Sequence, residues 1–163
     1  MDELKRSFPP VADARARVLV LGSLPGEQSL AQAQYYAHPR NHFWPLISAV
    51  IGRDLLPLPY EARLAALRDA GVALWDTVGS ARRRGSLDGA IRDAQSNGLV
   101  QLVETLPELR AVAFNGAKSV AVGQPQLAGF ENLELVTLPS SSPAYTLPIS
   151  AKLERWRELA RFL

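Results

Sequence analysis

The sequence contains no cysteine and only two histidines among its 163 residues. The absence of cysteine excludes a disulfide framework, an iron–sulfur cluster and a cysteine nucleophile. A zinc site would also lack most of its usual ligands, so we expect no metal and no cofactor. His38 and His42 lie four residues apart, but Pro39 between them argues against the shared helical face that a metal pair would need. The chemistry must therefore use carboxylates, amides, hydroxyls and the backbone.

Long apolar runs are also missing. The first ten residues carry charges where a secretory signal would have its apolar run, and no later stretch is long enough to cross a bilayer. We therefore expect a soluble cytoplasmic protein with no membrane partner. The formal net charge of +2 is a mild basic bias, which permits binding to a phosphate backbone but does not identify the partner.

The length and the 47% content of hydrophobic residues predict one globular domain, residues 1–163, with one substantial core. Apolar segments predict strands at 18–21, 72–78, 111–116 and 133–138. Periodic segments predict helices at 43–51, with Pro45 in the first turn, at 60–70, at 98–106, with Asn97 as cap, and at the C-terminus, where Lys152 belongs to the polar face. Strands that alternate with helices indicate a three-layer α/β/α fold around a central, mainly parallel four-stranded sheet.

In such a sheet, ligands bind at the carboxyl ends of the strands. The four strand exits begin at Gly22, Asp76, Asn115 and Pro139. The turn after Gly22 lacks the Lys-Ser/Thr of a phosphate-binding loop and the glycine spacing of a dinucleotide fingerprint. Ser23 follows Gly22 directly, so the spacing of a serine-hydrolase nucleophile elbow also fails. These exits therefore argue against nucleoside triphosphate, dinucleotide and serine-hydrolase chemistry.

The residues Gly22–Gly26 together with Tyr35–Trp44 resemble the first motif region of the mismatch-specific uracil/thymine branch of the uracil-DNA glycosylase superfamily. Leu138–Ala144 resembles the second motif of that superfamily, and Phe114–Gly116 the strand end before it. The superfamily usually carries a catalytic amide or carboxylate in the first turn, where this chain has Leu24. The longer match, which includes Trp75-Asp76 and Gly85–Asp88, is similar to the hypoxanthine-DNA glycosylase branch, family 6.

The resemblance implies a monofunctional DNA repair glycosylase of the nucleoid, acting as a monomer. Its substrate would be a deaminated base flipped out of double- or single-stranded DNA, with hypoxanthine preferred. A uracil or mismatch-specific uracil/thymine glycosylase, a catalytically silent nucleic-acid-binding member and a nucleoside hydrolase remain alternatives. No lysine in the motifs presents itself as a Schiff-base nucleophile, the closest being Lys118, so lyase activity is not expected.

In the hypoxanthine branch a downstream Asn substitutes for the missing catalytic group, and the matching residue is Asn41. Its side-chain carbonyl would orient water and face the developing sugar cation, although Asn41 could instead only cap the following helix. Asp76 is the second catalytic choice or a buried anchor, and Asp88 has a weaker claim. Tyr36 either stacks on the base or packs in the core.

The resemblance further implies two sets of contact residues. The base would be bound by Gly22, Ser23, Leu24, Pro25, Gly26, Tyr36, Phe43 and Asn115. The DNA would be bound by Ser140, Ser141, Ser142, Pro143, Ala144 and Tyr145, with a wedge near Ala144 that Tyr145 could replace. Arg82, Arg83 and Arg84 either contact phosphates or form a solvated loop.

Overall fold

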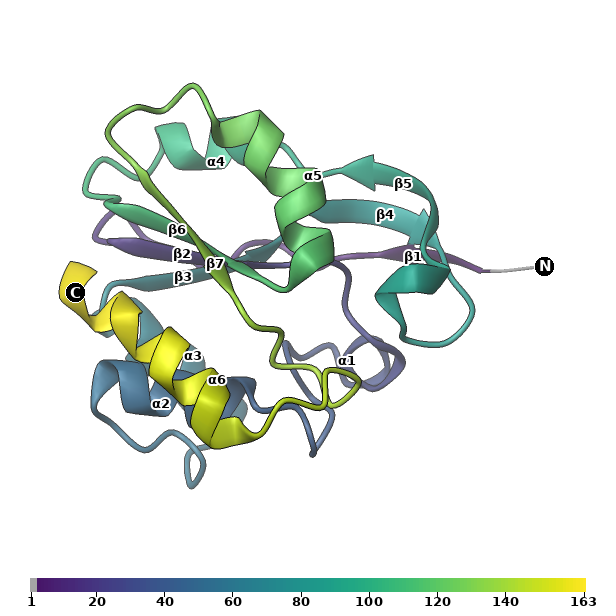
Figure 1. Ribbon diagram of the computed structural model, residues 1–163, viewed down its shortest axis with the longest axis horizontal. Coiled ribbons are helices and arrows are strands. Elements are labelled where there is room, and N and C mark those ends of the chain that lie inside the picture. The colour runs from purple at the N-terminus through teal and green to yellow at the C-terminus, as the bar shows by residue number, and fades with distance from the viewer. Residues whose placement is uncertain (1–2) are drawn as a thin grey trace.

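A computed structural model describes residues 3–163. Met1 and Asp2, the first of the ten residues whose charges argue against a secretory signal, lie outside the described residues. The central sheet has the strand order β3-β2-β6-β7 and every pair in it is parallel (Figure 1). Its strands are β2 (Val18–Gly22), β3 (Val72–Asp76), β6 (Ala111–Asn115) and β7 (Glu134–Leu138). The predicted four-stranded parallel sheet is confirmed.

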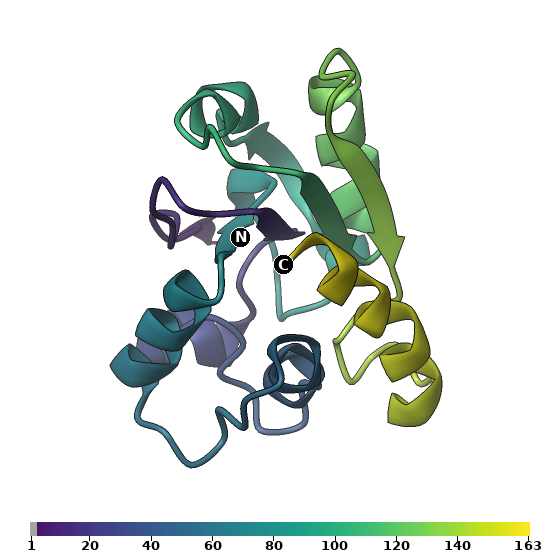
Figure 2. The same ribbon diagram turned by 90° about the vertical axis from the view of Figure 1, so that its left-hand side faces the viewer.

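The strands β2, β3 and β6 are buried on both faces, and alternate residues of β2 enter different cores. Val18 and Val20 pack with α2 (Phe43–Ile51), α3 (Tyr60–Asp69) and α6 (Ile149–Trp156). Leu19 and Leu21 pack with α4 (Leu99–Glu104) and α5 (Ala117–Leu127). Figures 1 and 2 show these two helix groups on opposite faces of the sheet, and the short α1 (Glu27–Gln32) at its carboxyl end. The predicted three-layer architecture is therefore confirmed.

A second, antiparallel sheet was not predicted. Its order is β1-β4-β5, formed by β1 (Leu4–Arg6), β4 (Val78–Arg82) and β5 (Arg92–Ser96). The predicted strand 72–78 is divided at Thr77: residues 72–76 pair with β2 in the central sheet, whereas β4 pairs with β1 and β5. A single-turn 3₁₀ helix, η1 (Asp88–Ala90), lies in the connection from β4 to β5.

Two predictions about individual residues were wrong. Asn97 does not cap α4, because its Nδ2 donates 2.8 Å to the carbonyl of Asp76 and so ties the start of the second sheet to β3. Lys152 is not on a solvated face: its exposed fraction is 0%, although the rest of the C-terminal segment packs as expected through Trp156 and Leu159. That segment continues beyond α6 as the 3₁₀ helix η2 (Arg157–Phe162). Within residues 3–163, no helix is both long and apolar enough to span a membrane.

Candidate active site

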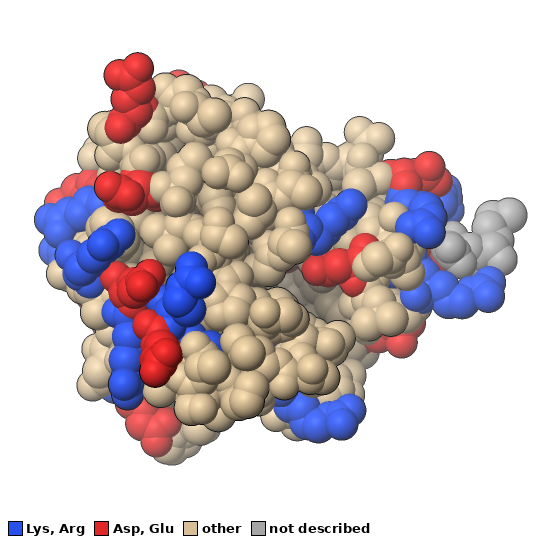
Figure 3. All heavy atoms as spheres, in the orientation of Figure 1, with Lys and Arg blue, Asp and Glu red and all other residues tan. Residues whose placement is uncertain are grey.

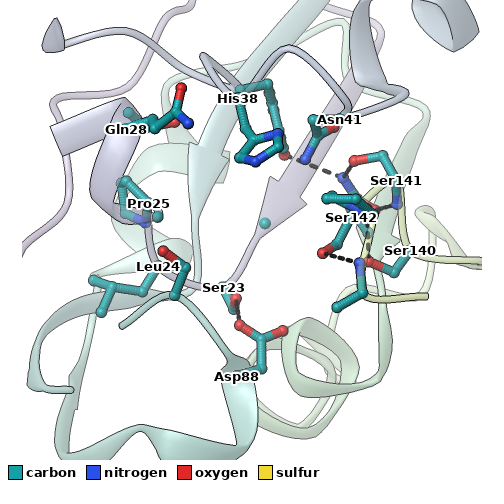
Figure 4. Close-up of a pocket in the computed structure, with 18 of the residues that line it drawn as sticks. Ser23, Leu24, Pro25, Gln28, His38, Asn41, Asp88, Ser140, Ser141 and Ser142 are labelled. Atoms are coloured by element: carbon teal, nitrogen blue, oxygen red, sulfur yellow. Dashed lines mark hydrogen bonds between the residues drawn. The ribbon is translucent and has the colours of Figure 1, made fainter. Parts of the chain in front are cut away.

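A cavity of about 490 Å³ opens at the carboxyl ends of the central strands. All four predicted strand exits line it, and so do two further loops: its lining comes from Gly22–Ser29, Tyr35, Tyr36, His38, Asn41, Asp76, Ser86–Asp88, Asn115 and Ser140–Tyr145 (Figure 4). Figure 3 shows a hollow to the right of centre, with charged side chains at its rim. A cavity of this size suits one enclosed small ligand such as a base.

The turn Gly22–Gly26, which follows β2, comes so close to the cavity floor at Gly22 that a side chain there would collide with it. A Cβ there would lie 2.6 Å from Oδ1 of Asp76 and 2.9 Å from the hydroxyl of Tyr36. Both of these groups line the cavity. Glycine at this strand end is therefore what allows the carboxyl group and the phenol to meet under the turn.

Asp76, the last residue of β3, is 4% exposed, and its Oδ2 has no hydrogen-bond partner. Burial raises the pKa of this carboxyl group to about 7, with a further rise from the charge of Asp88 and an opposing effect from Arg83. A large fraction of Asp76 is consequently neutral at pH 7.

The ring of Tyr36 stacks on Phe43, with centroids 4.0 Å apart and 16° between the planes. Tyr36 has a φ of 54°, a left-handed conformation that turns this ring toward the cavity wall. Phe43 itself is fully buried and does not line the cavity, so the prediction that it contacts the base was wrong. Its position behind Tyr36 makes it a support for the stacking surface.

The sequence could not decide whether Asn41 bonds to the start of the following helix or faces the cavity, and the structure shows that it does both. Its Oδ1 accepts a hydrogen bond of 2.9 Å from the N–H of Phe43, which begins α2, and its side chain also lines the cavity. A carbonyl oxygen has a second lone pair, so the cap does not prevent a contact with water. Figure 4 shows Asn41 beside His38, which the sequence brought up only as half of an unlikely metal pair. The Nδ1 of His38 accepts from the N–H of Arg40, and that bond orients the ring.

Leu24 occupies the position of the usual catalytic group but serves packing. It is 6% exposed and clusters with Val78, Ala81 and Ile91, between the first turn and the second sheet. On the opposite side, Ser23 donates from its Oγ to Oδ1 of Asp88 at 2.5 Å. The Ser86–Asp88 loop is thus a cavity wall, which the sequence indicated only through its resemblance to one glycosylase branch.

Arg83 does not contact solvent or phosphate, because only 1% of it is exposed. Its guanidinium donates to the carbonyl of Pro25, to that of Leu24 at 3.5 Å and, through Nε, to that of Gly85 at 2.9 Å. The predicted phosphate contact is therefore wrong for Arg83, which instead holds the first turn against the β4–β5 connection. Arg82 ends β4 with its Nε 3.9 Å from a carboxylate oxygen of Asp93, and Arg84 is exposed.

The serine-rich loop after β7 is held by Asn115. The Oδ1 of Asn115 accepts from the N–H of Ser141, and its Nδ2 donates to Oγ of Ser141, both at 2.9 Å. The same Nδ2 lies 3.3 Å from the hydroxyl of Tyr36. Asn115 thus connects Tyr36 to the loop that Ser140 to Tyr145 form at the cavity mouth, where Tyr145 is 47% exposed. Among residues 3–163, no cluster of three or more metal-ligating side chains occurs.

Comparison with known proteins agrees with this geometry. The family model of the uracil DNA glycosylase superfamily matches residues 9–160. A curated relative from Methanosarcina barkeri, named hypoxanthine DNA glycosylase, is 39% identical over 154 residues, covering 94% of this chain and 96% of the relative. A second protein of that name, from Methanosarcina acetivorans, is 40% identical over 141 residues, covering 86% of this chain and 88% of the relative.

A solved structure has the same fold. The solution NMR structure of a candidate uracil DNA glycosylase from Methanosarcina acetivorans superimposes with a TM-score of 0.88, at 37% identity and with 98% of each chain covered. The cavity at the ends of a parallel sheet and these matches define a DNA glycosylase. The chain belongs to the uracil DNA glycosylase superfamily, and the predicted resemblance to its hypoxanthine branch is confirmed.

Proposed function

We propose that this protein hydrolyses the N-glycosidic bond of hypoxanthine flipped out of DNA. The observation that carries the proposal is the cavity of about 490 Å³ that both Asn41 and Asp76 line, with Oδ2 of Asp76 left without a hydrogen-bond partner among the described residues. The two curated relatives, which bear the name hypoxanthine DNA glycosylase, support the choice of base. We further propose that the protein acts as a monomer at the nucleoid, with residues 1–163 as one domain.

The base would be held between the Tyr36 ring and the backbone of the first turn. Phe43 covers one face of the Tyr36 ring, which leaves the cavity side for stacking. Hypoxanthine presents a carbonyl next to an N–H. A neutral carboxyl group at Asp76 can donate to that carbonyl through its O–H. An ionised carboxylate could only accept, so the raised pKa of Asp76 favours this pairing.

Bond cleavage passes through an oxocarbenium-like sugar, which needs a positioned water and negative potential close by. Asn41 would supply the carbonyl oxygen that orients the water, and the bond from the N–H of Phe43 fixes that oxygen in place. His38, next to it on the cavity wall, is a second polar group within the same region. The phosphates of the DNA would add to the stabilisation of the cation.

The DNA itself would be gripped by the hydroxyls of Ser140 and Ser142, and Tyr145 would enter the vacated stack. Tyr145 fits the wedge better than Ala144, because it is a large side chain, 47% exposed, at the mouth of the cavity. Arg82 and Arg84, near the Ser86–Asp88 wall, remain proposed phosphate contacts.

The test is single-turnover release of base from matched duplexes that carry hypoxanthine or uracil. We expect the wild type to release hypoxanthine and Asn41→Ala to lose roughly a hundredfold or more in rate. Asn41→Ser is the matched control, because a serine hydroxyl can still accept from the N–H of Phe43 and cap α2. If Asn41→Ser keeps the melting temperature but loses the rate, Asn41 acts in catalysis and not only as a cap.

Each alternative has its own result in this assay. Release of uracil but not hypoxanthine would make the protein a uracil glycosylase. Salt-sensitive binding of damaged duplex without release of any base would make it a silent binding member of the fold. Hydrolysis of free deoxyinosine at a comparable rate would indicate a nucleoside hydrolase. If Asn41→Ala released the base at the wild-type rate, the catalytic role of Asn41 would be overturned and Asp76 would become the next catalytic candidate.

A further inference from the structure

Lys152, on α6, is buried without a compensating carboxylate. Its exposed fraction is 0%, and within residues 3–163 no Asp or Glu oxygen lies within 4.0 Å of its Nζ. Burial lowers the pKa of its amino group, which reflects the cost of keeping a charge away from water. Fully buried lysines are rare unless they are paired, so the position requires an explanation beyond packing.

The lysine points at the serine-rich loop. Its Nζ donates 3.2 Å to the carbonyl of Ser142 and lies 5.6 Å from the centre of the Tyr145 ring. Both of these residues line the cavity mouth, whereas Lys152 lies behind them. Its charge also contributes, after burial, to a lowered pKa of His42, the residue next to Asn41. The positive charge of Lys152 therefore acts on the residue next to Asn41.

Neighbouring carbonyls of the loop are held in the same way. The indole N–H of Trp156 donates 2.9 Å to the carbonyl of Pro139, and the backbone N–H of His42 donates 2.9 Å to that of Ser141. With Lys152 on Ser142, three carbonyls of this loop accept hydrogen bonds from α6 or from the start of α2. Lys152 is therefore one of three donors that hold the carbonyl side of this loop, and it is the one that carries a charge.

We propose that Lys152 is a positioning residue for DNA: from behind the loop it fixes the Ser142 carbonyl and the Tyr145 ring, and a DNA phosphate on the loop balances its charge. This inference rests on the proposed function, since the anion is a phosphate of the damaged strand. It explains why a costly charge is buried at this place. The lysine contacts neither the base nor the sugar, so its effect is on binding and not on bond cleavage.

The structure also predicts how the fold responds when the charge is removed. The Ser142 carbonyl accepts a second hydrogen bond, of 3.1 Å, from the N–H of Tyr145. Lys152→Met therefore leaves no orphaned acceptor there and removes the cost of a buried cation. We expect the melting temperature of Lys152→Met to equal or exceed that of the wild type, whereas a lysine needed only for stability would give a lower one.

The experiment measures the Kd for a duplex with a stable abasic-site analogue at several salt concentrations, together with melting temperature and single-turnover rate at saturating enzyme. Lys152→Met should raise Kd roughly tenfold at low salt and flatten the dependence of log Kd on log salt, and any change in the single-turnover rate should be smaller than the change in Kd. Lys152→Arg should restore most of the affinity. Arg161→Met, which removes one cation from the far end of the same C-terminal segment, is the charge-matched control and should bind as the wild type does.

Two results would overturn the inference. One is a Kd and salt dependence of Lys152→Met equal to those of the wild type. The other is a melting temperature lower by more than about 5 °C, a loss of over 1 kcal/mol that would make Lys152 a structural residue. Neither the Kd for the abasic duplex nor the melting temperature depends on which base the protein excises, because an abasic site carries no base. A wild type that releases no hypoxanthine would refute the proposed function, and the variants compared on abasic duplex would still decide the role of Lys152.

Discussion

The ring of Tyr36 lies on the ring of Phe43, 4.0 Å between centroids, and thereby forms one wall of the cavity from a loop residue and a core residue. Phe43 is fully buried and packs edge-on against Trp44 and Trp156. The loop that carries Tyr36 is thus anchored to α2 and α6 through aromatic contacts. A base stacked on Tyr36 would extend a column of rings that begins in the core.

Tyr36→Ala should weaken binding of hypoxanthine-containing DNA, because it removes the proposed stacking surface. A base–aromatic stack contributes about 1–3 kcal/mol, which corresponds to a roughly five- to hundredfold rise in Kd. Tyr36→Phe is the matched control, since it keeps the ring and loses only the contact with Nδ2 of Asn115. Fluorescence anisotropy on damaged and undamaged duplexes measures both. Equal Kd values for Tyr36→Ala and the wild type would show that the ring only packs.

Gly22→Ala should abolish most activity although it adds a single methyl group. The new Cβ would lie 2.6 Å from Oδ1 of Asp76 and 2.9 Å from the Tyr36 hydroxyl, so these side-chain ends would have to shift into the cavity that both residues line. Displacement of the cavity floor by a fraction of an ångström should lower the single-turnover rate roughly a hundredfold. Gly89→Ala is the control, because nothing lies within 4 Å of a Cβ there. Wild-type activity in Gly22→Ala would mean that the floor does not take part in catalysis.

The sequence alone predicted the central sheet because its strands are apolar runs that lie between helices. The antiparallel sheet could not be predicted in this way: all five residues of β5 are exposed, and β4 reads Val-Gly-Ser-Ala-Arg, so neither shows a clear hydrophobic period. Because parallel strands end at the same edge of a sheet, the sequence predicted that the four strand exits lie together. It could not predict that Gly22 lies close against the carboxyl group of Asp76, because that approach depends on the register of β2 and β3.

Two buried charges were misjudged although the spacing contained a signal. Arg83 follows Ala81 at the two-residue period of a strand, and both side chains are buried. Lys152 precedes Trp156 by four residues and Leu159 by seven, the spacing of one helical face, and all three are buried. In both cases residue type outweighed periodicity in the prediction, because charged side chains are seldom buried. Their burial reflects specific acceptors, which no sequence pattern reveals.

Arg83→Met should destabilise the protein, whereas the same substitution at an arginine that contacts DNA would weaken DNA binding and leave stability unchanged. It would leave the carbonyls of Leu24 and Pro25 without their buried donor, at a cost of about 3 kcal/mol. The melting temperature should fall by roughly 6–12 °C. Arg53→Met, at an exposed position after α2, is the charge-matched control and should leave it unchanged. If Arg83→Met melted like the wild type while DNA binding weakened, the guanidinium would contact DNA after all.

Asp76 should make the stability of the protein depend on pH in the direction opposite to that of a salt-bridged carboxylate. Its pKa is about 7 in the folded protein and near the ordinary value of 3.8 when unfolded. Between these values the folded state binds more protons, so this group favours folding fully below about pH 4 and progressively less as the pH rises to 7 and above. Asp76→Asn removes the ionisation. The melting temperature of the variant relative to the wild type should therefore rise from pH 5 to pH 8.

The same titration should appear in activity if neutral Asp76 donates to the base. The single-turnover rate of the wild type on hypoxanthine should fall above pH 7, as the O–H donor is lost. Asp76→Asn, whose amide can still donate and accept, should retain activity and show a flat profile over pH 6–9. Asp76→Ala, which can do neither, should be slow at every pH. A wild-type rate that instead rises through pH 7 would mean that the ionised carboxylate is the active form, and Asp76 would then be the base that activates water.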